Sequence, residues 1–318
     1  MYWAFQDVVV DGARHPLPLS WVVPGGDGRL FVEIGFGNGE FLAHLGRAEP
    51  GATVVGIEVS QWCVTKAARR VQACGLTNVR LLWGDARHLI PLCFAPASLD
   101  RVILNFPCPW PKNRHASRRV TSPEFAGLLS RFLKPGGFFS LATDVDWYAR
   151  SARECFAALP GFSLREERTN PQREYLTKYE RKWKEEGRDT FTLEVEWAGG
   201  GVPAPEPRFE EESLEMDMPN CGQGLASVLK GLLDREGGQG DHRFVFREAF
   251  TSPGGEGILL AITVDEGFEQ HFFLRFYPSR GRIAVKPDPT TLPYRTPAVK
   301  EALKEAARAL GSPASREA

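Results

Sequence analysis

The chain has 318 residues, which is too long for one average domain and suits two. Its 42% hydrophobic content excludes wholesale disorder, and its formal net charge of −1 leaves any RNA binding to a local patch. There is no run of about 18 apolar residues and no basic leader at the amino terminus, so we expect a cytoplasmic protein without a membrane span. The six scattered cysteines form no C-x-x-C pair and no cluster with histidine, which indicates reduced thiols and no metal site.

Short β-branched or apolar runs alternate with longer amphipathic runs over the first half of the chain. Strands separated by helical segments of this length pair in parallel through right-handed crossovers, which predicts a doubly wound α/β sheet. The expected strands are 30–35, 53–59, 79–83, 99–105, 138–143, 162–166 and 191–197. The expected helices are 40–48, 61–74, 123–133 and 147–159, with a turn at 134–137 and a charged loop between the last two strands.

The composition changes at a Gly/Pro-rich run of the kind that links domains. We therefore expect a domain at 1–197, a linker at 198–207 and a smaller α+β extension at 208–318. The elements expected in the extension are helices at 225–235 and 297–310 and strands at 243–250, 257–264, 269–276 and 282–286. No motif there indicates a chemistry, and a stabilising, a dimerising and an RNA-grasping role all stay open.

The most informative local pattern is a glycine loop between the first strand and the first helix, with Gly35, Gly37 and Gly39 in alternation. Glycine permits positive φ and lets a ligand lie directly on the backbone. Dinucleotide sites use G-x-G-x-x-G around a pyrophosphate. Here the spacing is G-x-G-x-G, and Glu33 in the strand would repel phosphate but suits an ammonium and a sulfonium. An ordinary glycine-rich turn is the alternative when the glycines are taken alone.

Two further carboxylates stand at the ends of the next two strands. Glu58 ends the second strand, where a ribose diol would lie, and Asp85 follows the third, where a carboxylate can accept a hydrogen bond from an adenine amino group. Each acid alone also fits a structural cap. Together with Glu33 and the glycines, they match an adenosyl ligand that has no phosphates.

The fourth strand leads into residues 105–119, which read Asn-Phe-Pro-Cys-Pro-Trp-Pro-Lys-Asn-Arg-His-Ala-Ser-Arg-Arg. Prolines stiffen this segment, Trp110 offers a stacking face, and basic residues occur with no acid among them. Looped RNA requires that combination, because aromatic rings stack on bases and cations meet phosphates. A solvated basic loop with a structural Trp is the alternative, but the position at the carboxyl edge of the sheet favours ligand binding.

The glycine loop and its acids resemble those of the class I S-adenosylmethionine (SAM)-dependent methyltransferases. The segment 106–119 closely resembles the signature Phe-Pro-x-Pro-Trp-x-Lys-x-Arg-His-x-x-Arg-Arg of the bacterial tRNA (guanine-N7)-methyltransferases. Ala-Thr-Asp at 142–144 and Leu-Thr-Lys-Tyr-Glu at 176–180 match the same family in order and spacing. The resemblance spans residues 28–197.

This resemblance implies a seven-stranded, mostly parallel sheet whose last strand is antiparallel. It also implies SAM as the cofactor and, as the substrate, the guanine at position 46 in the variable loop of tRNA. The residues implied to hold the cofactor are Glu33, Gly35, Gly37, Glu58, Asp85, Ala86 and Asn105. Those implied to meet the tRNA are Lys112, Arg114, Asp144, Thr177, Lys178, Tyr179 and Glu180.

The candidate catalytic residues are Asp144, Lys112 and Cys108. Cys108 departs from the family, many of whose members carry Asp between the two prolines as an active-site acid. Asn105 nearby is a candidate to substitute for that acid in part. Guanine N7 presents a lone pair without a proton, so its attack on a sulfonium methyl needs placement and no general base. We therefore expect no nucleophilic role for the Cys108 thiol. We expect Asp144 to stabilise the charge that develops on the purine, with a helix cap as its alternative role.

Residues 168–188 interleave arginine and lysine with Tyr175, Tyr179 and Trp183, which favours an RNA clamp over a merely solvated segment. Two rival functions stay open. An enzyme acting on small molecules would have no use for the basic aromatic loop, and a non-catalytic tRNA binder would explain Cys108. The sequence does not indicate the oligomeric state.

Overall fold

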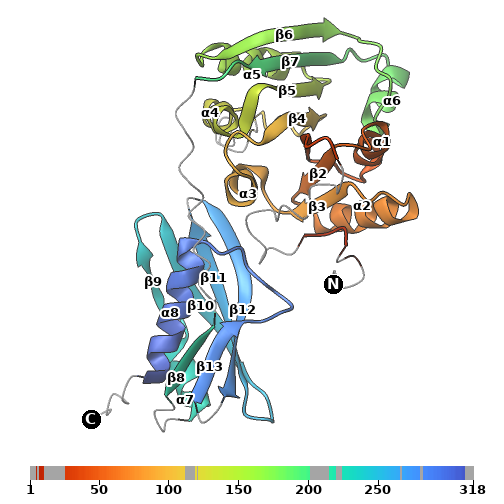
Figure 1. The fold of residues 1–318 in the computed structure, drawn as a ribbon. Helices are drawn as coiled ribbons and strands as arrows, with labels where there is room; N and C mark the ends of the chain where they lie inside the picture. The colour runs from red at the N-terminus through yellow and green to blue at the C-terminus, as the bar shows by residue number, and fades with distance from the viewer. Residues whose placement is uncertain are drawn as a thin grey trace. The chain divides into compact units, whose positions relative to one another are not determined.

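The computed structural model describes residues 5, 7–10, 26–111, 119, 121–200, 215–219, 224–265, 267–279 and 282–311. Contacts divide the chain into two compact units, Met1–Arg208 and Phe209–Ala318. Each unit has its own sheet and its own helices (Figure 1). Within the part of the chain that the structure describes, no helix is long and apolar enough to cross a membrane.

A seven-stranded sheet in the order β3-β2-β1-β4-β5-β7-β6 forms the first unit. Its strands are β1 (Leu30–Ile34), β2 (Thr53–Glu58), β3 (Val79–Trp83), β4 (Leu99–Asn105), β5 (Leu133–Thr143), β6 (Phe162–Thr169) and β7 (Phe191–Trp197). The first five strands pair in parallel, and β7 lies antiparallel between β5 and β6. This arrangement confirms the predicted doubly wound α/β class, including its antiparallel last strand.

Helices flank both faces of this sheet. They are α1 (Glu40–Ala48), α2 (Gln61–Ala73), α3 (Ala86–Cys93), α4 (Pro123–Phe132), α5 (Asp146–Ala157) and α6 (Lys178–Glu185). Phe31 of β1 and Val54 of β2 join Leu42 of α1 in a buried core on one face. On the other face, Phe139 of β5 stacks on Phe156 of α5 with ring centroids 4.8 Å apart. Both faces are buried over the central strands, which explains why these strands are mostly apolar.

Two expectations for this unit are wrong in detail. The turn predicted at 134–137 belongs to β5, where pairing with β4 jumps from Leu99↔Leu133 to Arg101↔Phe138 and so accommodates the Lys-Pro-Gly-Gly segment as an irregularity. The predicted charged loop between β6 and β7 contains α6. The only buried residue of α6 is a glutamate, so the helix has no apolar periodicity by which the sequence could reveal it. Helix α3, which contains a proline, was not predicted at all.

The second unit is a six-stranded antiparallel sheet in the order β8-β13-β12-β11-β10-β9. Its elements are β8 (Met216–Pro219), α7 (Leu225–Leu232), β9 (Glu236–Gln239), β10 (His242–Thr251), β11 (Gly257–Asp265), β12 (Phe268–Ser279), β13 (Arg282–Pro287) and α8 (Pro297–Gly311). Phe246, Leu259 and Phe272 on one face of the sheet pack against Leu229 of α7 and Leu303 of α8. The short outer strands β8 and β9 were not predicted.

Candidate active site

The carboxyl ends of β1 to β5 lie along one edge of the first sheet, because these strands are parallel. The β6–β7 connection reaches the same edge, since β7 is antiparallel to both β5 and β6. Arg181 of α6 pairs there with Glu40 of α1 at 2.9 Å, and the rings of Tyr175 and His44 stack with centroids 4.3 Å apart. The fold therefore brings the predicted cofactor loop and the Thr-Lys-Tyr-Glu segment to one edge (Figure 1).

The glycine loop after β1 adopts backbone conformations that require glycine. Gly35, Gly37 and Gly39 have φ angles of 69°, 55° and 73°. A Cβ on Gly39 would lie 2.7 Å from the Cβ of Ala67, so this glycine serves the packing of α1 on α2. A Cβ on Gly35 or Gly37 would meet nothing within 4 Å. The space over these two residues is open, and a ligand can lie there on the backbone.

Glu33 is a buried carboxyl with an unsatisfied oxygen. It is 2% exposed; its Oε1 accepts a hydrogen bond from Nδ2 of Asn105 at 3.2 Å, and its Oε2 has no partner among the described residues. Burial raises the pKa of this carboxyl to about 8, although the Asn105 hydrogen bond and the Arg173 charge act in the opposite direction. Such a group fits a ligand that brings a cation and hydrogen-bond donors.

Glu58, at the end of β2, is fixed by backbone donors. Its carboxylate accepts hydrogen bonds from the N–H of Gly37 and the N–H of Ser60, both at 3.0 Å. The first bond ties the glycine loop to β2. Glu58 is 9% exposed, so little of its carboxylate faces solvent.

Asp85 has a structural role at the third strand end. Its side chain caps α3 by accepting a hydrogen bond from the N–H of Arg87 at 2.9 Å, and it also pairs with the Arg87 guanidinium. Partial burial alone would raise the pKa of this carboxyl, but the hydrogen bonds from Arg87 outweigh burial and leave the pKa below its ordinary value. The capping alternative thus holds for Asp85, whose side chain is still 27% exposed. Ala86 beside it begins α3 and is buried.

The segment after β4 contains two non-glycine residues in the left-handed region, Phe106 with φ 48° and Trp110 with φ 46°. Such residues cost about 1–3 kcal/mol each and cluster at functional sites. Arg119 donates two hydrogen bonds to the carbonyl of Trp110, at 3.2 and 3.0 Å, and so holds the segment. Cys108, which lies between Phe106 and Trp110 in the sequence, is exposed. The predicted contacts Lys112 and Arg114 lie outside the described residues.

Asp144 follows β5 at the same edge, with its side chain 16% exposed. Its Oδ2 lies 3.5 Å from Nη1 of Arg188, which comes from the connection between α6 and β7. The N-cap of α5 is Val145, and no side chain caps that helix. The alternative role of Asp144 as a helix cap is therefore wrong.

The Thr-Lys-Tyr-Glu segment begins α6. Thr177 is the N-cap, and its hydroxyl oxygen accepts a hydrogen bond from the N–H of Glu180 at 3.2 Å. Glu180 is fully buried; its Oε2 pairs with Nη1 of Arg173 at 3.1 Å, and its Oε1 has no partner in the described part of the chain. Lys178 and Tyr179 are exposed on the first turn.

Arg173 is the functional candidate that sequence reasoning missed. Its guanidinium donates to Oδ1 of Asn105 at 2.8 Å as well as to Glu180, and its side chain is 19% exposed. The sequence placed Arg173 in the RNA clamp, but this arginine faces inward. A charged run gives no signal that separates one inward arginine from its solvated neighbours.

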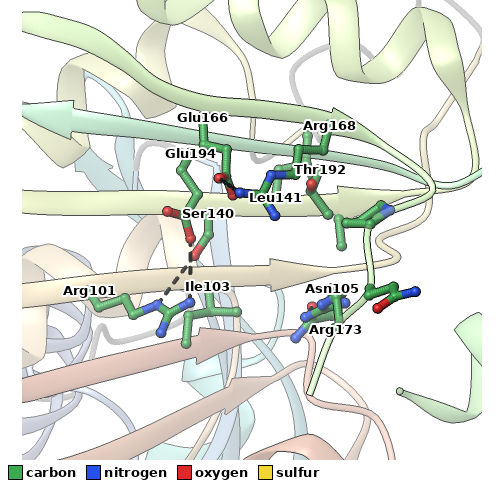
Figure 2. Close-up of a pocket in the computed structure, with 13 residues that line it drawn as sticks. Arg101, Ile103, Asn105, Ser140, Leu141, Glu166, Arg168, Arg173, Thr192 and Glu194 are labelled. Atoms are coloured by element: carbon green, nitrogen blue, oxygen red, sulfur yellow. Dashed lines mark hydrogen bonds and ion pairs between the residues drawn. The ribbon is translucent and has the colours of Figure 1, made fainter. Parts of the chain in front are cut away.

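A cavity of about 120 Å³ opens beside Asn105 and Arg173 (Figure 2). Figure 2 shows Arg101 beneath Glu194 in its wall, and the two side chains pair at 3.6 Å. Arg168 in the same wall pairs with Glu166. The cavity is polar and its charges are largely paired, so it extends the edge described above without forming a separate charged site.

Comparison with known proteins identifies the family. A family model described as "Putative methyltransferase" matches residues 27–193. The tRNA (guanine-N(7)-)-methyltransferase of Thermotoga maritima is 37% identical over 301 residues, which cover 93% of this chain and 95% of that protein. The chain belongs to the tRNA (guanine-N7)-methyltransferase family. This confirms the resemblance stated from the sequence.

Other relatives of this methyltransferase match over a smaller share of the chain. The enzyme of the same name from Thermus thermophilus is 45% identical over 52% of this chain and 53% of its own, and that from Nitrosococcus oceani is 40% identical over 58% and 78%. The Thermotoga maritima match is longer, because coverage of 93% of this chain must extend into Phe209–Ala318. Among solved structures, the antibiotic-resistance methyltransferase Kmr has a TM-score of 0.44 and 20% identity, covering 57% of this chain and 92% of that chain.

SAM is the methyl donor of this methyltransferase, and the edge of its sheet has what that cofactor requires. SAM carries an ammonium group, a sulfonium and a ribose but no phosphate. The open backbone at Gly35 and Gly37 and the unsatisfied buried oxygen of Glu33 fit such a ligand.

Proposed function

We propose that this protein transfers the methyl group of SAM to N7 of the guanine at position 46 in the variable loop of tRNA. The proposal is carried by one observation: the carboxylates suited to an adenosyl sulfonium and the Thr-Lys-Tyr-Glu segment of the tRNA methyltransferases share one sheet edge, linked through Asn105 and Arg173. The Thermotoga maritima relative, which aligns with this chain over 95% of its own length, is named tRNA (guanine-N(7)-)-methyltransferase. That name supports the choice of tRNA and of guanine N7.

Residues at the ends of three strands bind different parts of the cofactor. Glu33 accepts hydrogen bonds from the ammonium group, with Asn105 beside it, and Gly35 and Gly37 lie under the methionine part. Glu58 accepts hydrogen bonds from the ribose hydroxyls. Asp85 and Ala86 meet adenine, and Asp85 keeps its bond to the α3 backbone while its partly exposed carboxylate binds the adenine amino group. When bound, the cofactor supplies an electrophilic methyl on a positively charged sulfur.

The residues on the substrate side place the base and stabilise charge. Guanine N7 needs no general base, so catalysis depends on alignment and exclusion of water, which can contribute about 7–11 kcal/mol. Asp144 stabilises the positive charge that the purine gains, through hydrogen bonds to its N1–H and amino group. The Oε1 of Glu180, which has no partner among the described residues, adds an acceptor at the same sheet edge. Lys112, Arg114, Lys178 and Tyr179 bind the surrounding RNA.

Cys108 takes no covalent part in this reaction. A nucleophilic thiol activates ring carbons of pyrimidines, whereas N7 already has a lone pair. The Cys108 side chain is exposed, and on the substrate side this edge still carries the carboxylates of Asp144 and Glu180. The loss of an Asp at position 108 therefore leaves two acids able to meet the base.

The deciding experiment uses the purified full chain, an unmodified tRNA transcript and SAM labelled on its methyl group. We expect label in the tRNA, strand cleavage at position 46 after reduction and aniline treatment, and no label in a transcript with adenine at that position. Label elsewhere would contradict the assigned base, and tRNA binding without any transfer would favour the non-catalytic binder.

A further inference from the structure

Three buried side chains and the partly buried Arg173 form a continuous hydrogen-bonded relay across the sheet edge. Glu33 Oε1 accepts from Asn105 Nδ2 at 3.2 Å, and Asn105 Oδ1 accepts from Arg173 Nη2 at 2.8 Å. Arg173 Nη1 then donates to Glu180 Oε2 at 3.1 Å. The relay begins in β1 and ends in the first turn of α6, so it connects elements that are far apart in the sequence.

Each end of the relay has one unused acceptor. Within the described residues, Oε2 of Glu33 and Oε1 of Glu180 are buried without a hydrogen-bond partner. A buried carboxyl oxygen without a hydrogen-bond partner is costly, and more so when the group is charged. Both oxygens are therefore poised for ligands, one on the cofactor side of Asn105 and the other on the substrate side of Arg173.

We propose that Arg173 is a positioning residue that couples cofactor binding to tRNA binding, by holding Asn105 and Glu180 in one geometry through its two guanidinium nitrogens. This inference rests on the proposed function. Arg173 touches neither the methyl group nor the base. It acts through Glu180 on the guanine side and through Asn105 on the cofactor side.

The coupling has a physical basis in the central amide. Asn105 donates to Glu33 with one end and accepts from Arg173 with the other, so strengthening either bond polarises the amide and strengthens the other. A cationic ligand beside Glu33 favours its ionised form, and a hydrogen bond to a carboxylate is roughly twice as strong as one to a neutral acceptor. Asn105 is then held more firmly, and with it Arg173 and Glu180.

Arginine suits this position because its planar fork can serve two acceptors at fixed angles, whereas lysine presents a point charge. The guanidinium also lies over the ring of Phe41 in α1, 5.6 Å from its centroid, which limits its rotation. With two nitrogens engaged and 19% of its side chain exposed, Arg173 is poorly placed to bind an RNA phosphate.

The test measures binding of S-adenosylhomocysteine, which keeps the ammonium group but cannot react, with and without unmodified tRNA. Coupling between two sites typically changes affinity by about 5–150-fold and is reciprocal, so we expect tRNA to tighten this ligand about tenfold in the full chain. 5′-Methylthioadenosine lacks the amino-acid part and cannot reach Glu33. Its affinity should therefore not respond to tRNA. A merely structural role of Arg173 would not explain why tRNA tightens S-adenosylhomocysteine but not 5′-methylthioadenosine.

Three variants test the coupling role of Arg173, and thermal unfolding checks that each variant folds. Arg173→Met and Asn105→Ala should each reduce the coupling to within about twofold of none, and Arg173→Lys should fall between, because lysine keeps the charge without the fork. Arg131→Met, which removes an exposed arginine from the end of α4 at the opposite edge of the sheet, should keep the full tenfold effect.

Tenfold coupling in folded Arg173→Lys and Asn105→Ala, or no coupling in the unaltered protein, would overturn the inference. Should Arg173→Met fail to fold, the other two variants give the answer. Absence of methyl transfer in the unaltered protein would instead refute the proposed function, because coupling is measured by binding alone.

Discussion

Arg188 Nη1 lies 3.5 Å from Oδ2 of Asp144, so a cation from the connection after α6 neutralises the carboxylate at the end of β5. The same guanidinium lies 4.1 Å from the centroid of the Trp183 ring. Arg188 is half exposed, at 52% of its side chain, and can move away when a base approaches Asp144. The pair thus places a carboxylate with an exposed cation beside it at the position where we propose that the purine gains charge.

Asp144→Asn keeps the shape of the side chain and removes its charge. We expect turnover to fall by about 100-fold or more and the SAM affinity to change by less than about threefold, because the charge acts on the transition state. Single-turnover methylation and equilibrium binding measure the two quantities. Asp146→Asn, two residues further on and paired with Arg150, is the matched control and should keep normal turnover. Equal activity of both variants would remove Asp144 from the mechanism.

Gly35→Ala should separate backbone strain from loss of ligand space. Gly35 and Gly187 both have φ of 69°, and a Cβ on either would meet nothing within 4 Å. Alanine at each position should therefore cost a similar free energy of unfolding, about 1 kcal/mol. Only Gly35→Ala should also weaken SAM binding, by about tenfold or more, because its methyl group would occupy the cofactor's place. Equal SAM affinity of the two variants would mean that no ligand lies over Gly35.

The sequence could predict the first unit closely because most of its elements follow from apolar periodicity and strand-end glycines. It could not predict α6, whose only buried residue, Glu180, is held by an ion pair with Arg173. An ion pair of this kind forms only through tertiary contacts. In the sequence, the residues that form it cannot be distinguished from neighbouring charged residues that are solvated. For the same reason, the sequence identifies the acids at the strand ends by their position but does not identify the residues that hydrogen-bond to them.

Cys108→Ala should retain methylation within about threefold, because attack by N7 requires no thiol nucleophile. Steady-state methylation of tRNA measures this directly. Denaturing electrophoresis of the unaltered protein with labelled tRNA provides the complementary observation. A covalent complex between the two, lost in Cys108→Ala, would show that the exposed thiol reacts and that the mechanism is wrong.

The exposed cations of α6 should make tRNA binding depend on salt. Each phosphate contact contributes a slope of about 0.7–0.9 to the fall of log affinity with log salt concentration. Lys178→Met should therefore lower the slope by about one contact, while Arg131→Met, at the opposite edge of the sheet, should leave it unchanged. Filter binding over a range of potassium chloride concentrations gives both slopes. A flat salt response of the unaltered protein would exclude the predicted RNA clamp.

Glu33 should make the stability of the ligand-free protein depend on pH. Burial raises the pKa of its carboxyl to about 8 in the folded protein, above the value of 4.5 of an ordinary glutamate. Between these values the folded state binds a proton that the unfolded state has lost, so the free energy of unfolding falls as pH rises and levels off above about pH 8. The steepest slope is about 1.4 kcal/mol per pH unit.

Glu33→Gln cannot titrate and should lack this contribution. We therefore expect the wild-type protein to lose stability relative to the variant between about pH 5 and pH 8, in urea unfolding at several pH values. Saturating S-adenosylhomocysteine should flatten the wild-type curve, because its ammonium group favours the ionised carboxylate. Parallel curves for the two proteins without ligand would mean that Glu33 is ionised in the free protein at neutral pH.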